Sequence, residues 1–276
     1  MQFKSLEDKC LYYRGLSDYK LLPNSYVIVM LDGRSFSHMI KNKFQKPFDR
    51  IFVDMMNETA KYVCKNVQGA KFAYVQSDEI SIVLTDFDTP TTDAFFGNRL
   101  CKLQSIIASL ATSKFNQLMM SKLFDNLVDE YGNTPLLSCE YVMERINNGQ
   151  IYQFDCKAWN VPTYNDVFAW LLYRQIDCIR NSKQQTAQTY LSHKELMKRN
   201  TDEQVALLKE RNGIDWNEFD DDLKFGRFIY KVEKTLYTED NSPYTRYVWE
   251  VNNGYPLSDE YYRNMFHSLN VIPKQS

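Results

Sequence analysis

Apolar and polar positions recur along the first 185 residues in patterns that predict strands and helices in a definite order. Apolar, β-branched runs are typical of strands, and apolar residues spaced three or four positions apart are typical of helices. The patterns predict helices at about 4–20, 47–69, 93–127 and 165–182, and extended segments at 26–31, 71–85 (a hairpin), 137–145 and 151–158. The order strand, helix, strand, strand, helix, strand from residue 26 onward is that of a ferredoxin-like fold and of the polymerase palm, so we predict an α+β class.

The pattern changes beyond about residue 185, where the chain becomes more charged. A helical stretch at 193–211 and an acidic loop at 215–222 precede two strand-like arms, 225–237 and 244–251, whose connection has the turn chemistry of a hairpin. We therefore predict a palm-like domain over 1–185. Residues 186–276 are predicted to form an accessory helical and hairpin region packed on it, because no flexible linker separates the two.

Acidic residues follow two of the predicted strands. Asp32 and Gly33 end the strand at 26–31, and Asp78 and Glu79 lie at the tip of the hairpin. If the first strand pairs beside the hairpin, Asp32 and Asp78 converge. Two carboxylates without histidine or cysteine nearby are hard oxygen ligands that suit Mg²⁺ holding substrate phosphates, and two such ions are usual in nucleotidyl transfer. Taken singly, each segment is more often an ordinary turn.

Basic residues near two predicted helices are candidates for phosphate or RNA contacts. Lys46 and Asp49 lie at the start of the helix after Pro47, and a helix N-terminus with a lysine can cradle a triphosphate. The alternative is a solvated loop that also contains Lys41 and Lys43.

Two further helices present polar faces. Arg99 and Lys102 share one face of the helix at 93–127, and Arg174, Asp177 and Asn181 share a face of the helix at 165–182. Such faces more often consist of solvated side chains and intrahelical ion pairs. The nearby Arg180 and Lys183 make the second helix end basic, which suits an RNA backbone or a triphosphate, so both helix faces are candidates for such contacts.

Composition narrows the function classes. The 276 residues are 44% hydrophobic and 25% charged, which is ordinary globular composition, and the net charge of −2 leaves any RNA contact to local patches. Six cysteines without a C-x-x-C pair and only three histidines leave little for a zinc site. No 18-residue apolar run occurs, and the start of the chain lacks an apolar leader. We expect a soluble, cytoplasmic protein without a membrane partner.

Several short motifs occur in a fixed order along the chain. They are Leu31-Asp32-Gly33-Arg34-Ser35-Phe36, Phe44-Gln45-Lys46-Pro47-Phe48-Asp49, Gln76-Ser77-Asp78-Glu79, Phe154-Asp155-Cys156-Lys157 and Tyr173-Arg174-Gln175-Ile176-Asp177-Cys178, with Pro162 between the last two. With them the chain resembles the tRNA-histidine guanylyltransferases and their relatives, the 3′–5′ RNA polymerases. The resemblance covers roughly residues 5–185, and the segment around Lys224-Phe225-Gly226 resembles the family more loosely.

The resemblance implies an enzyme that adds nucleotides to the 5′ end of tRNA. ATP or GTP would first activate the 5′-phosphate, and the 3′-hydroxyl of an incoming nucleotide would then attack it. Asp32 and Asp78 would bind two Mg²⁺ with the Gly33 carbonyl, and Glu79 would bind metal or support the site. The nucleotide-binding residues implied are Arg34, Ser35, Phe36, Lys46, Asp49, Ser77, Arg99, Lys102 and Asn181. Arg174, Arg180 and Lys183 are the RNA-binding candidates, and the family is typically homotetrameric.

One departure from the family pattern points to a branch within it. Where the eukaryotic guanylyltransferases have His-Ile-Asn, this chain has Ile179, Arg180 and Asn181, so the histidine is absent. We expect the like-protein branch, which adds nucleotides against a template and repairs tRNAs truncated at the 5′ end. The alternatives are a non-templated tRNA-histidine guanylyltransferase, a palm-fold nucleotide cyclase and a non-catalytic RNA-binding module.

Overall fold

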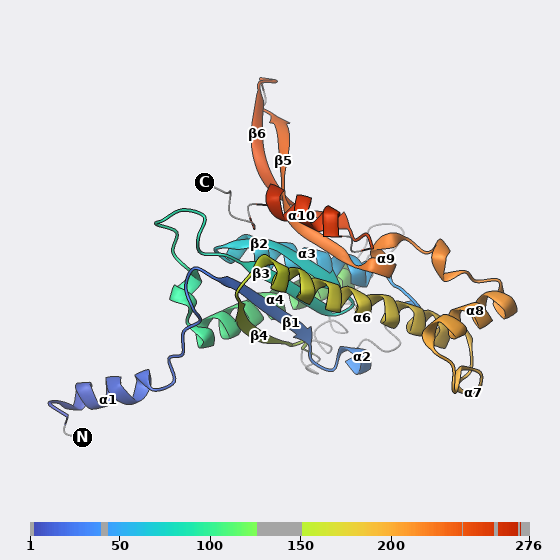
Figure 1. Ribbon diagram of the computed structural model, residues 1–276, viewed down its shortest axis with the longest axis horizontal. Coiled ribbons are helices and arrows are strands. Elements are labelled where there is room, and N and C mark those ends of the chain that lie inside the picture. The colour runs from blue at the N-terminus through green and yellow to red at the C-terminus, as the bar shows by residue number, and fades with distance from the viewer. Residues whose placement is uncertain are drawn as a thin grey trace.

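A computed structural model describes residues 3–39, 44–125, 151–238, 240–256, 259–269 and 271. These residues form a six-stranded antiparallel sheet in the order β4-β1-β3-β2-β5-β6 (Figure 1). The strands are β1 (Tyr26–Gly33), β2 (Ala70–Gln76), β3 (Glu79–Leu84), β4 (Phe154–Val161), β5 (Arg227–Tyr237) and β6 (Pro243–Asn253). The order β4-β1-β3-β2 is that of the ferredoxin-like fold, and the predicted α+β class is confirmed.

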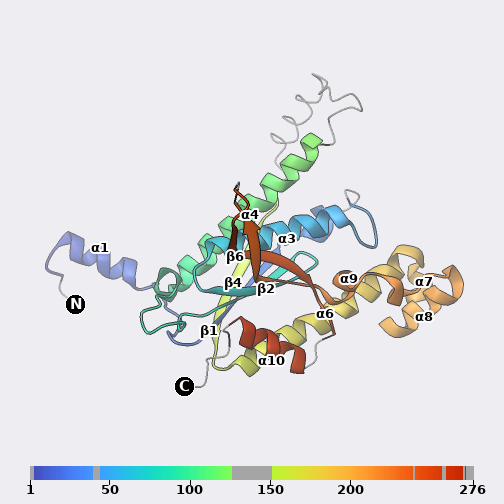
Figure 2. The ribbon, with the colours of Figure 1, turned by 90° about the horizontal axis from the view of Figure 1, so that it is seen from above.

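Helices cover both faces of the sheet. The α-helices of the described residues are α1 (Leu6–Gly15), α2 (Phe36–Met39), α3 (Arg50–Asn66), α4 (Leu100–Asp125), α6 (Tyr164–Tyr190), α7 (His193–Leu196), α8 (Thr201–Asn212), α9 (Asp221–Phe225) and α10 (Asp259–Ser268). Helices α3 and α4 lie on one face, and α6 and α10 lie on the other (Figure 2). Within the described ranges, no helix combines the length and the apolar character that crossing a bilayer requires.

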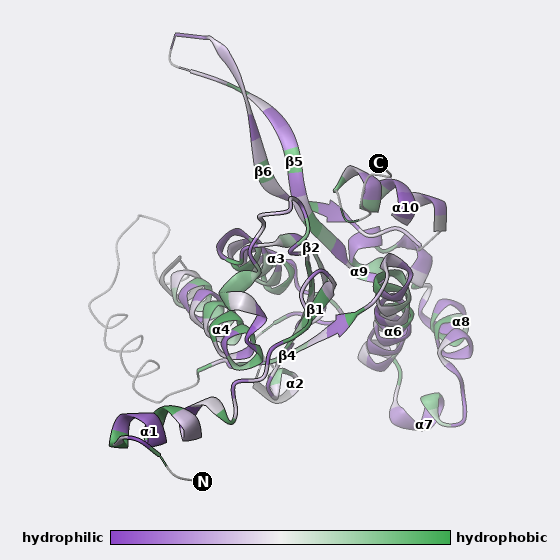
Figure 3. Cartoon of the chain, turned by 60° about the vertical axis from the view of Figure 1, so that its left-hand side comes forward, coloured by the Kyte–Doolittle hydropathy of each residue, from purple (hydrophilic) through white to green (hydrophobic). Residues whose placement is uncertain are grey.

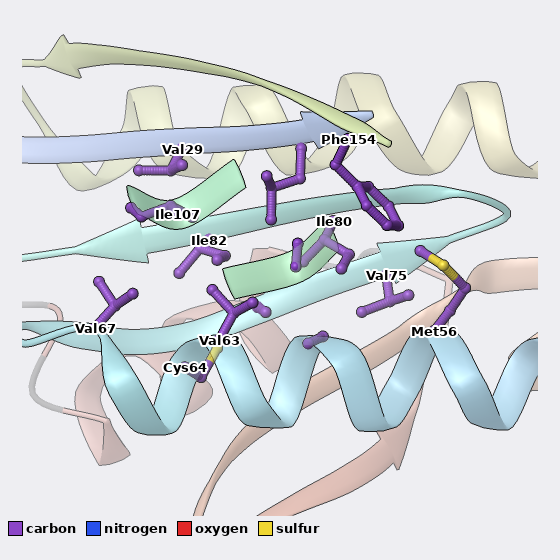
Figure 4. Packing of buried hydrophobic residues seen from close by; sticks show 14 of the residues in the cluster. Val29, Met56, Val63, Cys64, Val67, Val75, Ile80, Ile82, Ile107 and Phe154 are labelled. Atoms are coloured by element: carbon purple, nitrogen blue, oxygen red, sulfur yellow. The ribbon is translucent and has the colours of Figure 1, made fainter. Parts of the chain in front are cut away.

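The larger core lies between the sheet and the α3–α4 layer. Alternate residues of β1, namely Val27, Val29 and Leu31, point into this core, while Tyr26 belongs to the cluster on the α6–α10 face. Figure 4 shows side chains of the strands meeting those of α3. Every residue of β3 is buried because helices cover both its faces, which explains why Ile82, Val83 and Leu84 are apolar in succession. Figure 3 shows the hydrophobic colour gathered on the central strands, whereas the outer side of α6 is largely hydrophilic.

Several predicted helix boundaries were wrong. The helix expected from residue 93 begins at Leu100, because the preceding 3₁₀ turn η1 (Phe95–Asn98) contains positive φ angles at Phe96, Gly97 and Asn98. The helix expected at 193–211 is two helices, α7 and α8, with Lys198 at φ 62° between them. The N-terminal helix is also shorter than 4–20, and the extended segment at 137–145 lies outside the described residues.

Helix α6 continues eight residues beyond its predicted end at 182. A capping box formed by Thr163 and Asp166 starts it, and its last turns bury Ala187 in a small cluster with Leu196 and Leu208. Because the sequence of these last turns is mostly polar, it gave no indication that Ala187 would be buried. The 3₁₀ turn η2 (Trp216–Glu218) follows α8 and leads to α9.

The region beyond residue 186 extends the sheet of the first half. Strand β5 pairs with β2 from Phe72↔Tyr230 to Val75↔Arg227, and α10 packs the ring of Phe266 on that of Phe72. The outer half of the β5–β6 hairpin projects from the molecule (Figure 1). The division at 185/186 falls within α6, and the two-domain description stays a prediction.

Candidate active site

The acidic residues meet at one edge of the sheet. In the pairing of β1 with β3, Asp32 lies opposite Glu79, and in the pairing of β1 with β4 it lies opposite Asp155. The main-chain oxygen of Asp78 accepts a hydrogen bond of 3.1 Å from the Gly33 amide. The expected pairing of the first strand beside the acidic hairpin is therefore present, and it brings Asp32 and Asp78 together.

Gly33 and Ser77 fix the position of the Asp78 carboxylate. A Cβ atom on Gly33 would lie 2.9 Å from Asp78 Oδ2 and 2.6 Å from Phe36 Cγ, so a larger residue would displace one of them. Ser77 occupies the tight turn between β2 and β3 with a φ of 43°, as primed hairpin turns require at their first central residue. Its hydroxyl donates a hydrogen bond of 2.9 Å to Asp78 Oδ1.

Glu79 is buried and paired with an arginine of α6. Arg174 donates from Nε to Oε1 at 2.7 Å and from Nη2 to Oε2 at 2.6 Å, and Nη2 also lies 3.0 Å from Asp177 Oδ2. The rings of Trp170 and Tyr173 lie beside the guanidinium group. Both Glu79 oxygens are thus engaged, and the arginine expected to bind RNA is held inside the protein.

The local electrostatics favour a bound cation. Burial raises the pKa of Asp32, Asp78 and Glu79 above the usual range, and Asp155 raises the pKa of Asp32 further, against the opposing effect of Lys157 and Arg174. A bound cation would offset the cost of ionising these carboxyl groups.

The available donors suit Mg²⁺. Within the described ranges, no group of three or more His, Cys, Asp or Glu side chains could hold a metal ion by itself. Mg²⁺ is typically bound by one or two carboxylates completed by water and substrate phosphates. The Asp32 and Asp78 carboxylates are oxygen donors of this kind, so the residues present fit the ion that the sequence implies.

A pocket beside the acids brings together four of the expected nucleotide-binding residues. Its lining includes Lys46, Asp49, Ser77 and Asn181, and its cavity has a volume of about 120 Å³. Aromatic and apolar side chains form much of the remaining wall; they include Phe44, Pro47, Phe48, Phe52, Val53 and Leu223. Pockets for whole ligands are typically about 300–1,000 Å³, so this one has room for part of a nucleotide, and its combination of polar groups with aromatic walls is typical of a ligand site.

Asp49 also has a structural part in this pocket. Its Oδ1 accepts hydrogen bonds from the amides of Ile51 and Phe52 at the start of α3, and its Oδ2 accepts one from the Gln45 amide at 2.7 Å. The carboxylate therefore caps α3 and ties the loop that precedes it. Asn181 donates to Asp177 Oδ2 at 3.2 Å.

The other residues of the first motif lie elsewhere. Arg34 is exposed and donates to Gln153 Oε1 at 2.9 Å, and Ser35 is exposed with a φ of 58°. The ring of Phe36 is 1% exposed and packs in the core against those of Phe115 and Phe154, so only its main chain is available to a nucleotide. Their assigned roles stay predictions.

Arg99 and Lys102 lie at the far end of the sheet, where β1 begins. Arg99 forms an isolated bridge with Lys20 and lies 3.7 Å from Asp18, whereas the part of α4 near the acids is around Asn116, which contacts Tyr152. Within one chain, the structure does not bring these two residues to the pocket.

The basic end of α6 is only partly free. Arg180 pairs with Asp177 but its side chain is 62% exposed, while Lys183 is 19% exposed and donates to Asp202 at 2.6 Å. Lys41 and Lys43 lie outside the described residues.

Sequence reasoning missed Asp155 and Arg227. Asp155 belongs to the Phe154–Lys157 motif, in which it follows the buried Phe154. It pairs with Asp32 and so lies on the same sheet face. The alternation of buried and exposed residues in this motif is the signal that could have identified it. Arg227 is buried at the start of β5 and lines the pocket. Nothing in its local sequence distinguishes it from an exposed strand residue.

Comparisons of sequence agree with the geometry. A family model described as tRNAHis guanylyltransferase matches residues 9–162. The tRNA(His) guanylyltransferase of Neurospora crassa is 28% identical over 222 residues, which are 76% of this chain and 68% of that protein.

Solved structures extend the likeness to nearly the whole chain. A bacterial tRNA(His) guanylyltransferase-like protein in complex with ATP is 32% identical with a TM-score of 0.76, and the match covers 95% of this chain and 98% of that one. A structure of a bacterial tRNA(His) guanylyltransferase-like protein in complex with GTP is 28% identical with a TM-score of 0.72, and the match covers 98% of this chain and 100% of that one. Together with the acidic edge and the pocket, these matches show that the chain belongs to the tRNAHis guanylyltransferase family of nucleotidyltransferases.

Proposed function

We propose that this protein adds nucleotides to the 5′ end of tRNA in the 3′–5′ direction against a template, and so repairs tRNAs truncated at that end. The observation that carries the proposal is the segment Ile179-Arg180-Asn181, in which the family's asparagine is kept at the pocket while its histidine is missing. The likeness to bacterial guanylyltransferase-like proteins over almost the whole chain supports it.

The acidic edge provides what phosphoryl chemistry requires. Displacement at phosphorus depends on positioning and charge neutralisation more than on a nucleophilic side chain. Two Mg²⁺ held by Asp32, Asp78 and the Gly33 carbonyl would neutralise the phosphates and lower the pKa of the attacking hydroxyl. Ser77 orients the Asp78 carboxylate, and Arg174 keeps the neighbouring Glu79 in place.

The reaction consists of two transfers. The 5′-phosphate oxygen of the tRNA first attacks the α-phosphorus of ATP or GTP and pyrophosphate leaves; the activating nucleotides are suggested by the ATP and GTP complexes of the bacterial relatives. The 3′-hydroxyl of the incoming nucleotide then attacks the activated 5′-phosphorus, and the nucleoside monophosphate leaves. Lys46 and Asn181, which both line the pocket, contact the triphosphate.

RNA is bound by local basic groups, since the net charge is −2. Arg180 is the most exposed cation of α6 near the pocket and contacts the RNA backbone. We further propose that the protein is a cytoplasmic homotetramer, as the family resemblance suggests. Light scattering after size-exclusion chromatography tests the tetramer by its mass.

The test of the function uses two 5′-monophosphorylated tRNAs with Mg²⁺, ATP and all four nucleotides. One tRNA lacks its first 5′ nucleotide and the other is intact histidine tRNA. Templated repair predicts extension of the truncated tRNA by the nucleotide complementary to the opposing base. Repeating the assay after changing that opposing base should change the nucleotide added.

Guanosine addition to intact histidine tRNA alone would overturn the proposal in favour of the non-templated enzyme. Turnover of GTP without RNA would indicate a cyclase, and RNA binding without Mg²⁺-dependent turnover would indicate a binding module.

A further inference from the structure

Arg227, at the start of β5, is a buried cation whose contacts are incomplete. Its side chain donates from Nε to Asn57 Oδ1 at 2.8 Å and from Nη1 to the main-chain oxygen of Asp222 at 3.3 Å. The residue is 3% exposed, and Nη2 is buried without a hydrogen-bond partner in the part of the chain that the structure describes. A buried donor without a partner is costly, and in folded proteins such groups are normally satisfied by a water, an ion or a ligand.

The charge of Arg227 is also uncompensated by direct contacts. Both of its acceptors are neutral carbonyl oxygens, and the Asp222 carboxylate pairs with Arg50 instead. The neighbouring Cys178 thiol is neutral, since burial raises its pKa to about 11. An isolated buried cation favours an anionic partner over a neutral one, because only an anion restores both the hydrogen bond and the charge balance.

The position of Arg227 identifies the source of that anion. Arg227 lines the same pocket as Lys46, Ser77 and Asn181. On the neighbouring strand β2 it pairs with Val75, which lies two residues before Ser77 in the sequence. The carboxylate in this pocket, on Asp49, is already engaged by three main-chain amides. The anion must therefore come from outside the described chain.

We propose that Arg227 is a phosphate-binding residue of the nucleotide pocket, in which Nη2 donates to a phosphate oxygen of a bound nucleoside triphosphate. Arg227 and Lys46, which line the same pocket, then both contact the phosphates. The inference rests on the proposed function only in taking a nucleoside triphosphate as the ligand, and it concerns binding rather than transfer.

The experiment measures binding of GTP, inorganic tripolyphosphate and guanosine by calorimetry with Mg²⁺ present, on the full chain. Arg227→Met removes the charge and keeps most of the volume. We expect it to weaken GTP and tripolyphosphate binding by about 10- to 100-fold and to leave guanosine binding unchanged, because hydrogen bonds to charged groups are the strong ones. Arg246→Met, which changes an exposed arginine of the adjacent strand β6, is the matched control and should bind all three like the unaltered protein.

A second variant keeps the test decisive if Arg227→Met does not fold. Arg227→Gln retains a donor for the existing carbonyl contacts and removes the charge, and it should show the same loss of tripolyphosphate binding. Thermal melts of each variant without ligand report folding separately from affinity.

Three results would overturn the inference. They are a folded Arg227→Gln or Arg227→Met that binds tripolyphosphate normally, a loss confined to GTP and guanosine (a base contact), and failure of the unaltered protein to bind tripolyphosphate. The proposed function fails differently: the unaltered protein would bind these ligands and extend neither tRNA.

Discussion

Asp78 and Glu79 are adjacent in sequence, yet only the Glu79 carboxylate has an arginine bound to both of its oxygens. Glu79 has both carboxylate oxygens bound by Arg174, whereas Asp78 accepts a hydrogen bond from the neutral Ser77 hydroxyl. Arg227 is a comparable case with the opposite charge, since its Nη2 is buried without a hydrogen-bond partner among the described residues. The comparison distinguishes ionic groups that stabilise the fold through an ion pair from ionic groups whose charge and hydrogen bonds a ligand would balance.

The largest expected effect is the loss of nucleotide addition when Asp32 or Asp78, the carboxylates that a bound cation would balance, is removed. Asp32→Ala and Asp78→Ala should each lower nucleotide addition by at least about three orders of magnitude, since several kcal/mol of charge stabilisation is lost. Circular dichroism should show an unchanged fold. Asp93→Ala, at an exposed acid far from the site, is the control for the rate assay. Near-normal addition by either alanine variant would refute the metal assignment.

Breaking the buried ion pair between Arg174 and Glu79 should instead lower the stability of the fold. Arg174→Met leaves Glu79 buried without its partner and should reduce the free energy of unfolding by about 3–5 kcal/mol, measured by urea denaturation. Arg180→Met, which changes an exposed arginine of the same helix, should cost less than about 1 kcal/mol. Adding Glu79→Gln to Arg174→Met should recover part of the loss. Equal stabilities of the Arg174 and Arg180 variants would contradict the distinction.

The smallest expected effect is an increase in stability rather than a loss. Burial raises the pKa of Asp78 in the folded protein, so the ionised carboxylate destabilises the fold at neutral pH. Asp78→Asn should therefore raise the melting temperature by a few degrees at pH 7 without Mg²⁺. As the pH falls through the raised pKa, the wild-type carboxyl group becomes protonated and this advantage disappears. A constant advantage down to pH 3, measured by calorimetric scans, would be inconsistent with titration of Asp78.

The convergence of Asp32 and Asp78 could be predicted because it depends on local signals. A strand that ends in an acid and a hairpin with an acidic tip are visible in the sequence, and the strand order then places them at one edge. The motif around Lys46 could likewise be assigned to the start of a helix, because Pro47 and Asp49 are helix-start residues.

The partners of these residues could not be predicted in the same way. Arg174 and Glu79 are 95 residues apart, and their contact depends on how α6 packs on the sheet. The local sequence around Arg227 does not distinguish it from an exposed strand residue, and its burial results from contacts with α3, α9 and β2. A charged residue gives no local signal that other elements will bury it.

Helix α6 sets the spacing between the acidic edge and the nucleotide pocket. Arg174, Cys178 and Asn181 lie four and three residues apart, so they share one face, and Arg174 and Asn181 are separated by about 10 Å along the axis at 1.5 Å per residue. No loop intervenes, so this distance does not change when loops vary in length. Inserting one residue between Cys178 and Asn181 would turn Asn181 by about 100° and remove its amide from the pocket, although every original side chain would still be present.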